Sequence, residues 1–225
     1  MRSSPLLTVS DLSIGFAANG DKTQMVHNVS FEVFKGKTIA LVGESGSGKS
    51  ITALSILGLL PYPVAYHSSG SIKYHNTDGT HELLNLGEKK LQKFRGKEIA
   101  MVFQEPLSAL NPLQTIEQQI AEPLHIHTQM SQAQINDRVK ELLDMVEFKD
   151  GCSRLKSYPH ELSGGQRQRV MIAMALACEP KVLIADEPTT ALDVTIQKGI
   201  ISLIKRLSAT QDMGIILISH DLNMV

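Results

Sequence analysis

The residues with the clearest chemical meaning form a glycine-rich octapeptide that matches the pattern G-x-x-x-x-G-K-[ST] in full. It consists of Gly43, Glu44, Ser45, Gly46, Ser47, Gly48, Lys49 and Ser50, and Ile51 follows it. Glycines let a backbone wrap around phosphate groups with its amide N–H groups pointing inward, and a following helix N-terminus adds positive partial charge. The pattern predicts a nucleotide site in which Lys49 neutralises the β- and γ-phosphates and the Ser50 hydroxyl ligates Mg²⁺. The other interpretation is a Gly/Ser linker that contains the tripeptide Gly-Lys-Ser by chance. The apolar strand before the loop and the helical pattern after it disfavour this interpretation.

A second chemical feature is the pair of carboxylates that ends the apolar run KVLIADE, Asp186 and Glu187. Buried acids are costly unless they meet a cation or a polar cluster, and Mg²⁺ beside a phosphate loop supplies that cation. Asp186 is therefore predicted to hold the metal, directly or through water, and Glu187 to act as general base on the attacking water. The alternative is a strand that ends in an acid capping the next helix.

The elements that must position these groups alternate between two hydrophobic periods. Three of the four short runs expected to be core strands are apolar nearly throughout, as in parallel strands buried on both faces. Longer segments between them follow the helical period. The expected strands are Lys37–Val42, Glu98–Phe103, Lys181–Ala185 and Gly214–Ser219, and the expected helices are Ser50–Leu60, Gln114–His127, Ser131–Phe148, Gln166–Cys178 and Thr195–Thr210.

We expect one α/β domain spanning residues 1–225, with a mostly parallel sheet as its core. An antiparallel β region is predicted at about residues 5–36 and 70–75, because those segments alternate and are punctuated by turn residues. Residues 75–93 are polar and turn-rich, which predicts a surface excursion. The helix-rich stretch of about residues 105–165 lies between two core strands and is interpreted as an inserted helical subdomain.

Composition excludes several classes of protein. The 225 residues carry 22 Lys+Arg against 23 Asp+Glu, and this balance argues against a dedicated nucleic-acid binder, which usually has a basic excess. A hydrophobic content of 42% is enough for a packed core, so wholesale disorder is excluded. No run approaches the roughly 18–20 apolar residues of a membrane span. Two cysteines without metal-ligand spacing indicate reduced thiols in a cytosolic protein.

Five further landmarks occur in the order found in one family. The segment Leu162-Ser163-Gly164-Gly165-Gln166 opens a helix, and Ser-Gly-Gly before a helix could by itself be only a turn and N-cap. The other four landmarks are Phe16 upstream of the octapeptide, Gln104 after the strand EIAMVF, Ala191-Leu192-Asp193 after the carboxylates, and His220 after the strand IILIS. Together they make the chain, from about residue 6 to its end, resemble the ATP-binding cassette (ABC) ATPases, which bind ATP and Mg²⁺. The segments FQEPLSALNP, YPHEL and DEPTTALD are similar to those of the peptide, dipeptide and nickel importer branch of this family. They most resemble the N-terminal cassette of a fused two-cassette peptide importer subunit of the microcin C type.

The resemblance implies a role for each landmark. Phe16 would stack on adenine, and Gln104 would sense Mg²⁺ and the attacking water. His220 would hold the γ-phosphate and the water in line, and Asp193 would couple two sites. Ser163, Gly164, Gly165 and Gln166 would contact ATP bound by the phosphate loop of a second cassette. Ile51 stands where many relatives have threonine, so it would contribute only its backbone amide.

The resemblance also implies partners and a location. The second cassette could be a copy of this chain, a paralogue or a fused half. Separate transmembrane permease subunits and, indirectly, a periplasmic or extracellular solute-binding protein would complete an importer, with the cassette on the cytoplasmic face of the inner membrane. The chain stops five residues after His220, so we expect an excised or truncated cassette.

Two other functions remain open at this point. A non-transport ABC ATPase of the chromosome-maintenance, repair or translation-factor type is disfavoured by the short interval between Ser50 and Ser163 and by the neutral charge. A binding-only cassette of an asymmetric pair is disfavoured by the presence of Glu187, His220 and the LSGGQ segment.

Overall fold

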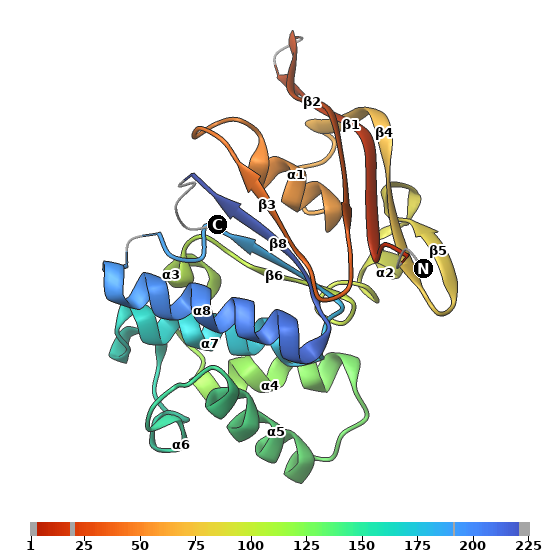
Figure 1. Ribbon diagram of the computed structural model, residues 1–225. Coiled ribbons are helices and arrows are strands. Elements are labelled where there is room, and N and C mark those ends of the chain that lie inside the picture. Colours follow the sequence, from red (N-terminus) through yellow and green to blue (C-terminus); the bar gives the residue numbers. More distant parts are fainter. Residues whose placement is uncertain (1–3, 19–20, 191, 221–225) are drawn as a thin grey trace.

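A four-stranded parallel sheet forms the central layer of the molecule (Figure 1). The computed structural model describes residues 4–18, 21–190 and 192–220. The strand order is β3-β8-β7-β6, and every pairing within this sheet is parallel. The strands are β3 (Thr38–Val42), β6 (Ile99–Val102), β7 (Val182–Asp186) and β8 (Gly214–Ser219). The predicted parallel core is thereby confirmed, with β3 at one edge and only partly buried.

A second, antiparallel sheet is built from the N-terminal strands in the order β2-β1-β4-β5. Its strands are β1 (Leu7–Ala18), β2 (Asp21–Val33), β4 (Ala65–Asn76) and β5 (Gly79–Glu82). The helix α1 (Lys49–Ile56) lies between this sheet and the parallel one (Figure 1). The predicted antiparallel region is confirmed, and β4 begins five residues earlier than expected.

Helices cover the opposite face of the parallel sheet (Figure 1). The long ones are α4 (Ile116–His127), α5 (Gln132–Met145), α7 (Gly164–Leu176) and α8 (Val194–Gln211). The short ones are α3 (Pro106–Ala109), α6 (Gly151–Arg154) and the 3₁₀ turn η2 (Pro159–Glu161), whereas the 3₁₀ turn η1 (Leu83–Asn85) and the helix α2 (Glu88–Leu91) lie on the α1 side of the sheet. Three long helices start with a capping box, formed by Thr115 for α4, Ser131 for α5 and Ser163 for α7, each paired with a glutamine three residues later. Pairs of this kind satisfy backbone N–H groups that a helix start otherwise leaves without partners.

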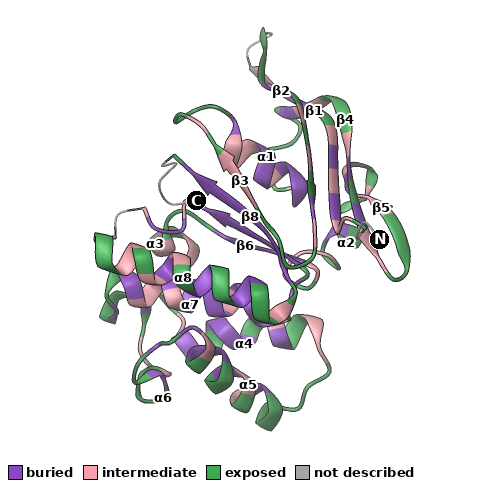
Figure 2. Cartoon of the chain, viewed as in Figure 1, coloured by how far each residue is buried: buried purple, intermediate pink, exposed green. Residues whose placement is uncertain are grey.

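The core consists of two hydrophobic clusters, one on each face of the parallel sheet (Figure 2). In β7, Leu183 and Ala185 belong to the cluster shared with the helices, whereas Val182 and Ile184 belong to the cluster shared with α1 and the antiparallel sheet. This alternation follows from the two-residue period of a strand. It explains why β6, β7 and β8 are apolar except at the carboxyl ends of β7 and β8: both faces of each strand are buried.

Residues 75–93 lie mostly at the surface, as predicted, but they contain a hairpin and two short helical turns that the sequence did not indicate. β4 and β5 form a hairpin whose connection, Thr77 and Asp78, is followed by Gly79, and Asp-Gly is a dipeptide that favours tight hairpin turns. Leu83 and Leu91 then turn inward and are buried in the cluster on the α1 side. Apolar residues are sparse in this segment, so it shows no clear alternation of apolar and polar residues from which the hairpin could be predicted.

Some element boundaries also differ from the predicted ones. α1 ends at Ile56 instead of Leu60, since Gly58 adopts a left-handed backbone conformation that breaks the helix. α5 ends at Met145, just before Glu147, which has a φ of 55°. The outline of one domain with an inserted helical subdomain stays a prediction. Within the described part of the chain, no helix combines the length and the apolar character that crossing a bilayer demands.

Candidate active site

The phosphate-loop residues connect β3 to α1, as the motif requires. Gly46 and Gly48 have φ angles of 80° and 88°, in the left-handed region that favours glycine. A Cβ atom on Gly48 would lie 2.9 Å from the backbone oxygen of Met25 and 2.8 Å from Cγ2 of Val26, so β2 closely approaches the loop. The buried hydroxyl of Thr52 donates a hydrogen bond to the Gly48 carbonyl at 2.9 Å and fixes the start of α1.

The ammonium group of Lys49 lies at the centre of the loop. It donates hydrogen bonds to the carbonyl oxygens of Gly43 at 2.8 Å and Glu44 at 2.7 Å, and to Oγ of Ser47 at 3.3 Å. These bonds hold the positive charge of Lys49 at the loop, where it can attract a phosphate group.

Asp186 and Ser50 form the second part of the site. The Ser50 hydroxyl donates a hydrogen bond to Oδ1 of Asp186 at 3.0 Å, which joins α1 to the end of β7. Asp186 is only 5% exposed, and burial raises the pKa of its carboxyl above the ordinary range, while the Ser50 hydrogen bond opposes this. A divalent cation next to this carboxylate would favour its charged form, and Mg²⁺ prefers oxygen donors such as carboxylate and hydroxyl. The donor set therefore fits Mg²⁺.

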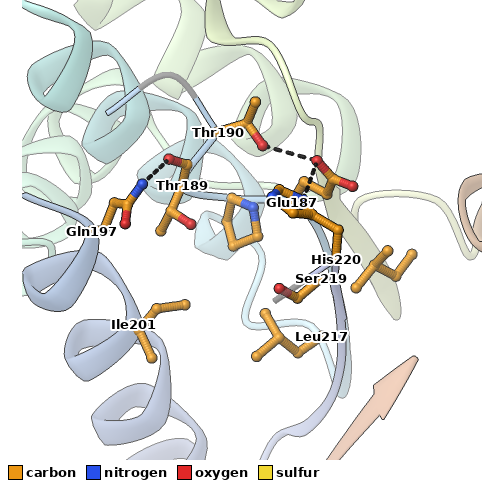
Figure 3. A pocket seen from close by; sticks show the side chains of 10 residues that line it. Glu187, Thr189, Thr190, Gln197, Ile201, Leu217, Ser219 and His220 are labelled. Carbon is orange, nitrogen blue, oxygen red and sulfur yellow. Dashed lines mark hydrogen bonds and ion pairs between the residues drawn. The ribbon is translucent and has the colours of Figure 1, made fainter. Parts of the chain in front are cut away.

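Glu187 has an unusual backbone, with a φ of 42° in the left-handed region. Its backbone N–H donates to the carbonyl of Ile218 on β8 at 3.1 Å. Its Oε2 atom accepts hydrogen bonds from Nε2 of Gln104 at 3.0 Å and from Oγ1 of Thr190 at 3.0 Å, and it lies 3.2 Å from Nδ1 of His220. Figure 3 shows the last two of these contacts. Side chains from the ends of three adjacent strands thus meet at one carboxylate.

A cavity of about 450 Å³ unites these groups. Its lining contains most of the phosphate loop and all four predicted catalytic side chains, those of Lys49, Gln104, Glu187 and His220. The lining residues are Met25, Ser45, Gly46, Ser47, Gly48, Lys49, Ser50, Ile51, Gln104, Glu187 and His220. A cation, a hydroxyl and a carboxylate that face one cavity can bind a triphosphate and polarise a water molecule beside it.

The LSGGQ residues do not line this cavity. Ser163 caps α7: its hydroxyl accepts a hydrogen bond from the backbone N–H of Gln166 at 3.3 Å. A Cβ atom on Gly165 would lie 2.9 Å from Ile196, and one on Gly164 would lie 3.2 Å from Leu192. The two glycines therefore allow α7 to pack closely against the beginning of α8 and the segment before it.

The cavity lining also lacks five other predicted residues: Gly43, Glu44, Asp186, Asp193 and Phe16. Asp193 is the N-cap of α8, and its Oδ1 accepts hydrogen bonds from the backbone N–H groups of Thr195 at 3.1 Å and Ile196 at 3.0 Å. Phe16 is in β1, partly buried against the cluster on the α1 side. The coupling role of Asp193 and the adenine contact of Phe16 stay predictions.

Sequence reasoning missed two residues of the site. Met25 lines the cavity from β2, a strand distant in sequence from the phosphate loop, and no pattern indicated its position. Thr190 contacts the Glu187 carboxylate, and its place three residues after Glu187 in a Pro-containing turn was an available signal.

Comparisons with known proteins agree with this geometry. The family model described as "ABC transporter" matches residues 26–190. The chain is 54% identical to the peptidoglycan transport ATP-binding protein YejF of Agrobacterium fabrum, over 98% of this chain and 40% of that protein. It is 48% identical to the dipeptide transport ATP-binding protein DppD of Bacillus subtilis, over 98% of this chain and 64% of that protein. The chain therefore spans less than two thirds of the length of these relatives.

A solved structure shares the fold. The ATP-binding cassette MJ0796, in a dimeric post-hydrolysis state bound to ADP and Pi, superimposes with a TM-score of 0.84 and 29% sequence identity. The match covers 97% of this chain and 89% of the solved one. This likeness extends over the parallel sheet, the antiparallel sheet and the helical layer.

Proposed function

The chain belongs to the ABC transporter family, and from this premise we propose that it binds and hydrolyses ATP to power the import of peptides through separate membrane subunits. The names of relatives at 48–54% identity, which refer to peptidoglycan and dipeptide transport, support the substrate class. The observation that carries the proposal is the meeting of Lys49, Glu187 and His220 at one cavity beside the Ser50–Asp186 pair.

Binding of the triphosphate rests on charge and backbone geometry. Lys49 and the N–H groups of the glycine-rich loop would hold the β- and γ-phosphates. Ser50 and Asp186 would hold Mg²⁺, with Gln104 facing the same space. When bound, Mg²⁺ neutralises charge on the phosphate oxygens and so assists transfer of the terminal phosphoryl group.

Hydrolysis requires a base near the terminal phosphate. Glu187 would accept the proton of the attacking water, since its carboxylate lies at the cavity and is only 15% exposed. His220 and Gln104 would orient the water and the γ-phosphate from the neighbouring strand ends. This set of side chains favours a hydrolysing cassette over a binding-only one.

A second cassette would complete the site. Ser163, Gly164, Gly165 and Gln166 lie outside the cavity of their own chain, so they would serve ATP held by the phosphate loop of a partner. The similar cassette MJ0796 is dimeric, which supports this arrangement.

An apolar groove next to Gln104 would receive the membrane subunits. Its lining includes Leu57, Leu59 and Phe103, together with Met171 and Met174 of α7. Because it joins the core to the helical layer, an apolar segment of a permease seated there would move with both. The cassette would then lie on the cytoplasmic face of the inner membrane, and a solute-binding protein would act on the other side.

The experiment is the molar mass of the Glu187→Gln variant in solution, measured by light scattering with and without Mg-ATP. The amide oxygen that this substitution introduces can still accept the hydrogen bonds of Gln104 and Thr190, so we expect an intact site that binds ATP without turning it over. A doubling of mass with ATP, and none with ADP or in a Lys49→Ala/Glu187→Gln control, supports the proposal. A variant that binds no ATP overturns it, whereas a monomer that binds ATP assigns the second site to a different cassette.

A further inference from the structure

We infer that Thr190 is a positioning residue: its hydroxyl fixes the carboxylate of Glu187 in the orientation that activates water. This inference rests on the proposed ATP hydrolysis and extends it to a residue outside the family landmarks. It also explains how a carboxylate on a strained backbone keeps one orientation.

The contact between Thr190 and Glu187 has two points. The backbone N–H of Thr190 donates to the carbonyl of Glu187 at 3.1 Å, which closes a turn. The Thr190 hydroxyl then donates to Oε2 of the same residue at 3.0 Å (Figure 3). A side chain held by a turn to the residue that it contacts loses little further entropy when the second bond forms.

The other two contacts of the Glu187 carboxylate differ from the Thr190 contact because they come from residues that line the nucleotide cavity. Gln104 and His220 come from the ends of β6 and β8, and both line the cavity that would hold the phosphates. The side chain of His220 is 56% exposed, and it can turn toward a ligand. Thr190 does not line that cavity, so its bond to Glu187 can persist while Gln104 and His220 contact the nucleotide.

The loop that carries Thr190 is itself anchored to α8. Nε2 of Gln197 donates hydrogen bonds to the backbone oxygens of Thr189 at 3.3 Å and Leu192 at 3.0 Å, on either side of Thr190. Figure 3 shows the first of these bonds at a second cavity, which has a volume of about 250 Å³ and is lined in part by Glu187, Thr190 and Gln197. Gln197 therefore holds the turn in place from a long, well-packed helix.

The backbone of Glu187 makes such support necessary. A non-glycine residue with positive φ is sparsely populated and persists only where its surroundings enforce it. Here the Ile218 carbonyl holds the backbone N–H, and the Thr190 hydroxyl holds the side chain. The described contacts of the carboxylate all fall on Oε2, which leaves Oε1 to take the proton from water.

The experiment compares Thr190→Val with Thr190→Ser. Valine keeps the shape and removes the hydroxyl, whereas serine keeps the hydroxyl. Loss of a hydrogen bond to a charged group should lower kcat by about 10- to 100-fold in Thr190→Val, with KM for ATP within about twofold of the unaltered chain. Thr190→Ser should retain kcat within a few-fold. Crystal structures of both variants should show Glu187 in more than one orientation in the valine variant alone.

The outcomes separate this inference from the proposed function. Equal kcat in the unaltered chain and Thr190→Val, a serine variant as slow as the valine variant, or an unchanged Glu187 side chain in the valine structure each overturn the inference. An unaltered chain that binds no ATP overturns the proposed function instead. The structural comparison needs no turnover, so it decides the positioning role in either case, and thermal melts of both variants establish that they fold.

Discussion

The contact between the phosphate loop and β2 predicts that two neighbouring glycines tolerate alanine very differently. Gly46 and Gly48 have nearly the same φ, 80° and 88°. A Cβ atom on Gly46 meets no atom within 4 Å, whereas one on Gly48 would lie 2.8 Å from Cγ2 of Val26 and 2.9 Å from the oxygen of Met25. Alanine at Gly46 would therefore introduce backbone strain alone, whereas alanine at Gly48 would introduce the same strain together with steric crowding.

The magnitudes follow from these distances. Alanine in the left-handed region costs about 1–2 kcal/mol, and this should be the whole loss in Gly46→Ala. Crowding in a packed region adds about 1–3 kcal/mol, so Gly48→Ala should lose about 2–5 kcal/mol in the free energy of unfolding. The Met25 oxygen belongs to the backbone of β2 and can retreat only if the strand moves, which places Gly48→Ala toward the upper part of that range.

The assay is urea unfolding of both variants without nucleotide, followed by far-UV circular dichroism. Without ATP the result depends on the fold alone. A Val26→Ala substitution should cost less stability in the Gly48→Ala background than in the unaltered chain, because in that background it also removes one of the two crowded atoms. Equal losses in the two single variants, or a larger loss in Gly46→Ala, would refute the reasoning.

Three other predictions follow from the site and the core. Ser50→Ala should lower ATP affinity about tenfold or more in the presence of Mg²⁺ and little in EDTA, because the hydroxyl is assigned to the metal. Nucleotide titrations in both buffers measure these affinities, and equal losses of affinity in the two buffers contradict the assignment. Burial lowers the pKa of His67, whose ring is 2.7 Å from the Ser55 hydroxyl, so below about pH 6.5 the unfolded state binds more protons than the folded state. Stability from this group is therefore complete above that pH and is lost as the pH falls through the lowered pKa. Urea unfolding at pH 7.5 and 5.5 should show a smaller loss in His67→Gln than in the unaltered chain, and an equal loss excludes this residue as the source. Leu142→Ala should lower the free energy of unfolding by about 2–5 kcal/mol because Leu142 is 0% exposed, whereas Leu113→Ala, at a site 85% exposed, should change it by no more than about 0.5 kcal/mol. Thermal melts that show similar losses of stability in the two variants would be inconsistent with the described core.

The parts of the fold that could be predicted from sequence are those with a strong local pattern. The apolar runs of β6, β7 and β8 predicted a buried parallel sheet because burial on both faces favours apolar residues at successive positions. The helices α4, α5 and α7 were predicted from their periodicity, although their ends shifted by a few residues. The phosphate loop was found because phosphate binding demands glycines at a fixed spacing.

The parts that could not be predicted depend on tertiary contacts. The β4–β5 hairpin carries few apolar residues, and its pairing depends on a turn and on Leu83 reaching the core. Met25 reaches the site only because two sheets enclose α1. The position of Thr190 three residues after Glu187 was a sequence signal, but the direction in which its hydroxyl points depends on the folded turn.

The alternation of side chains along β7 has a consequence for which sequence changes this protein can tolerate. Val182, Ile184 and Asp186 share one face of the strand, and Asp186 reaches Ser50 on that face. Inserting or deleting one residue within β7 would turn each following side chain to the opposite face. The same change would disrupt both hydrophobic clusters and exchange the directions of the two carboxylates. Length variation among functional descendants should therefore concentrate in connections such as that between α4 and α5, while the number of residues in β7 stays constant.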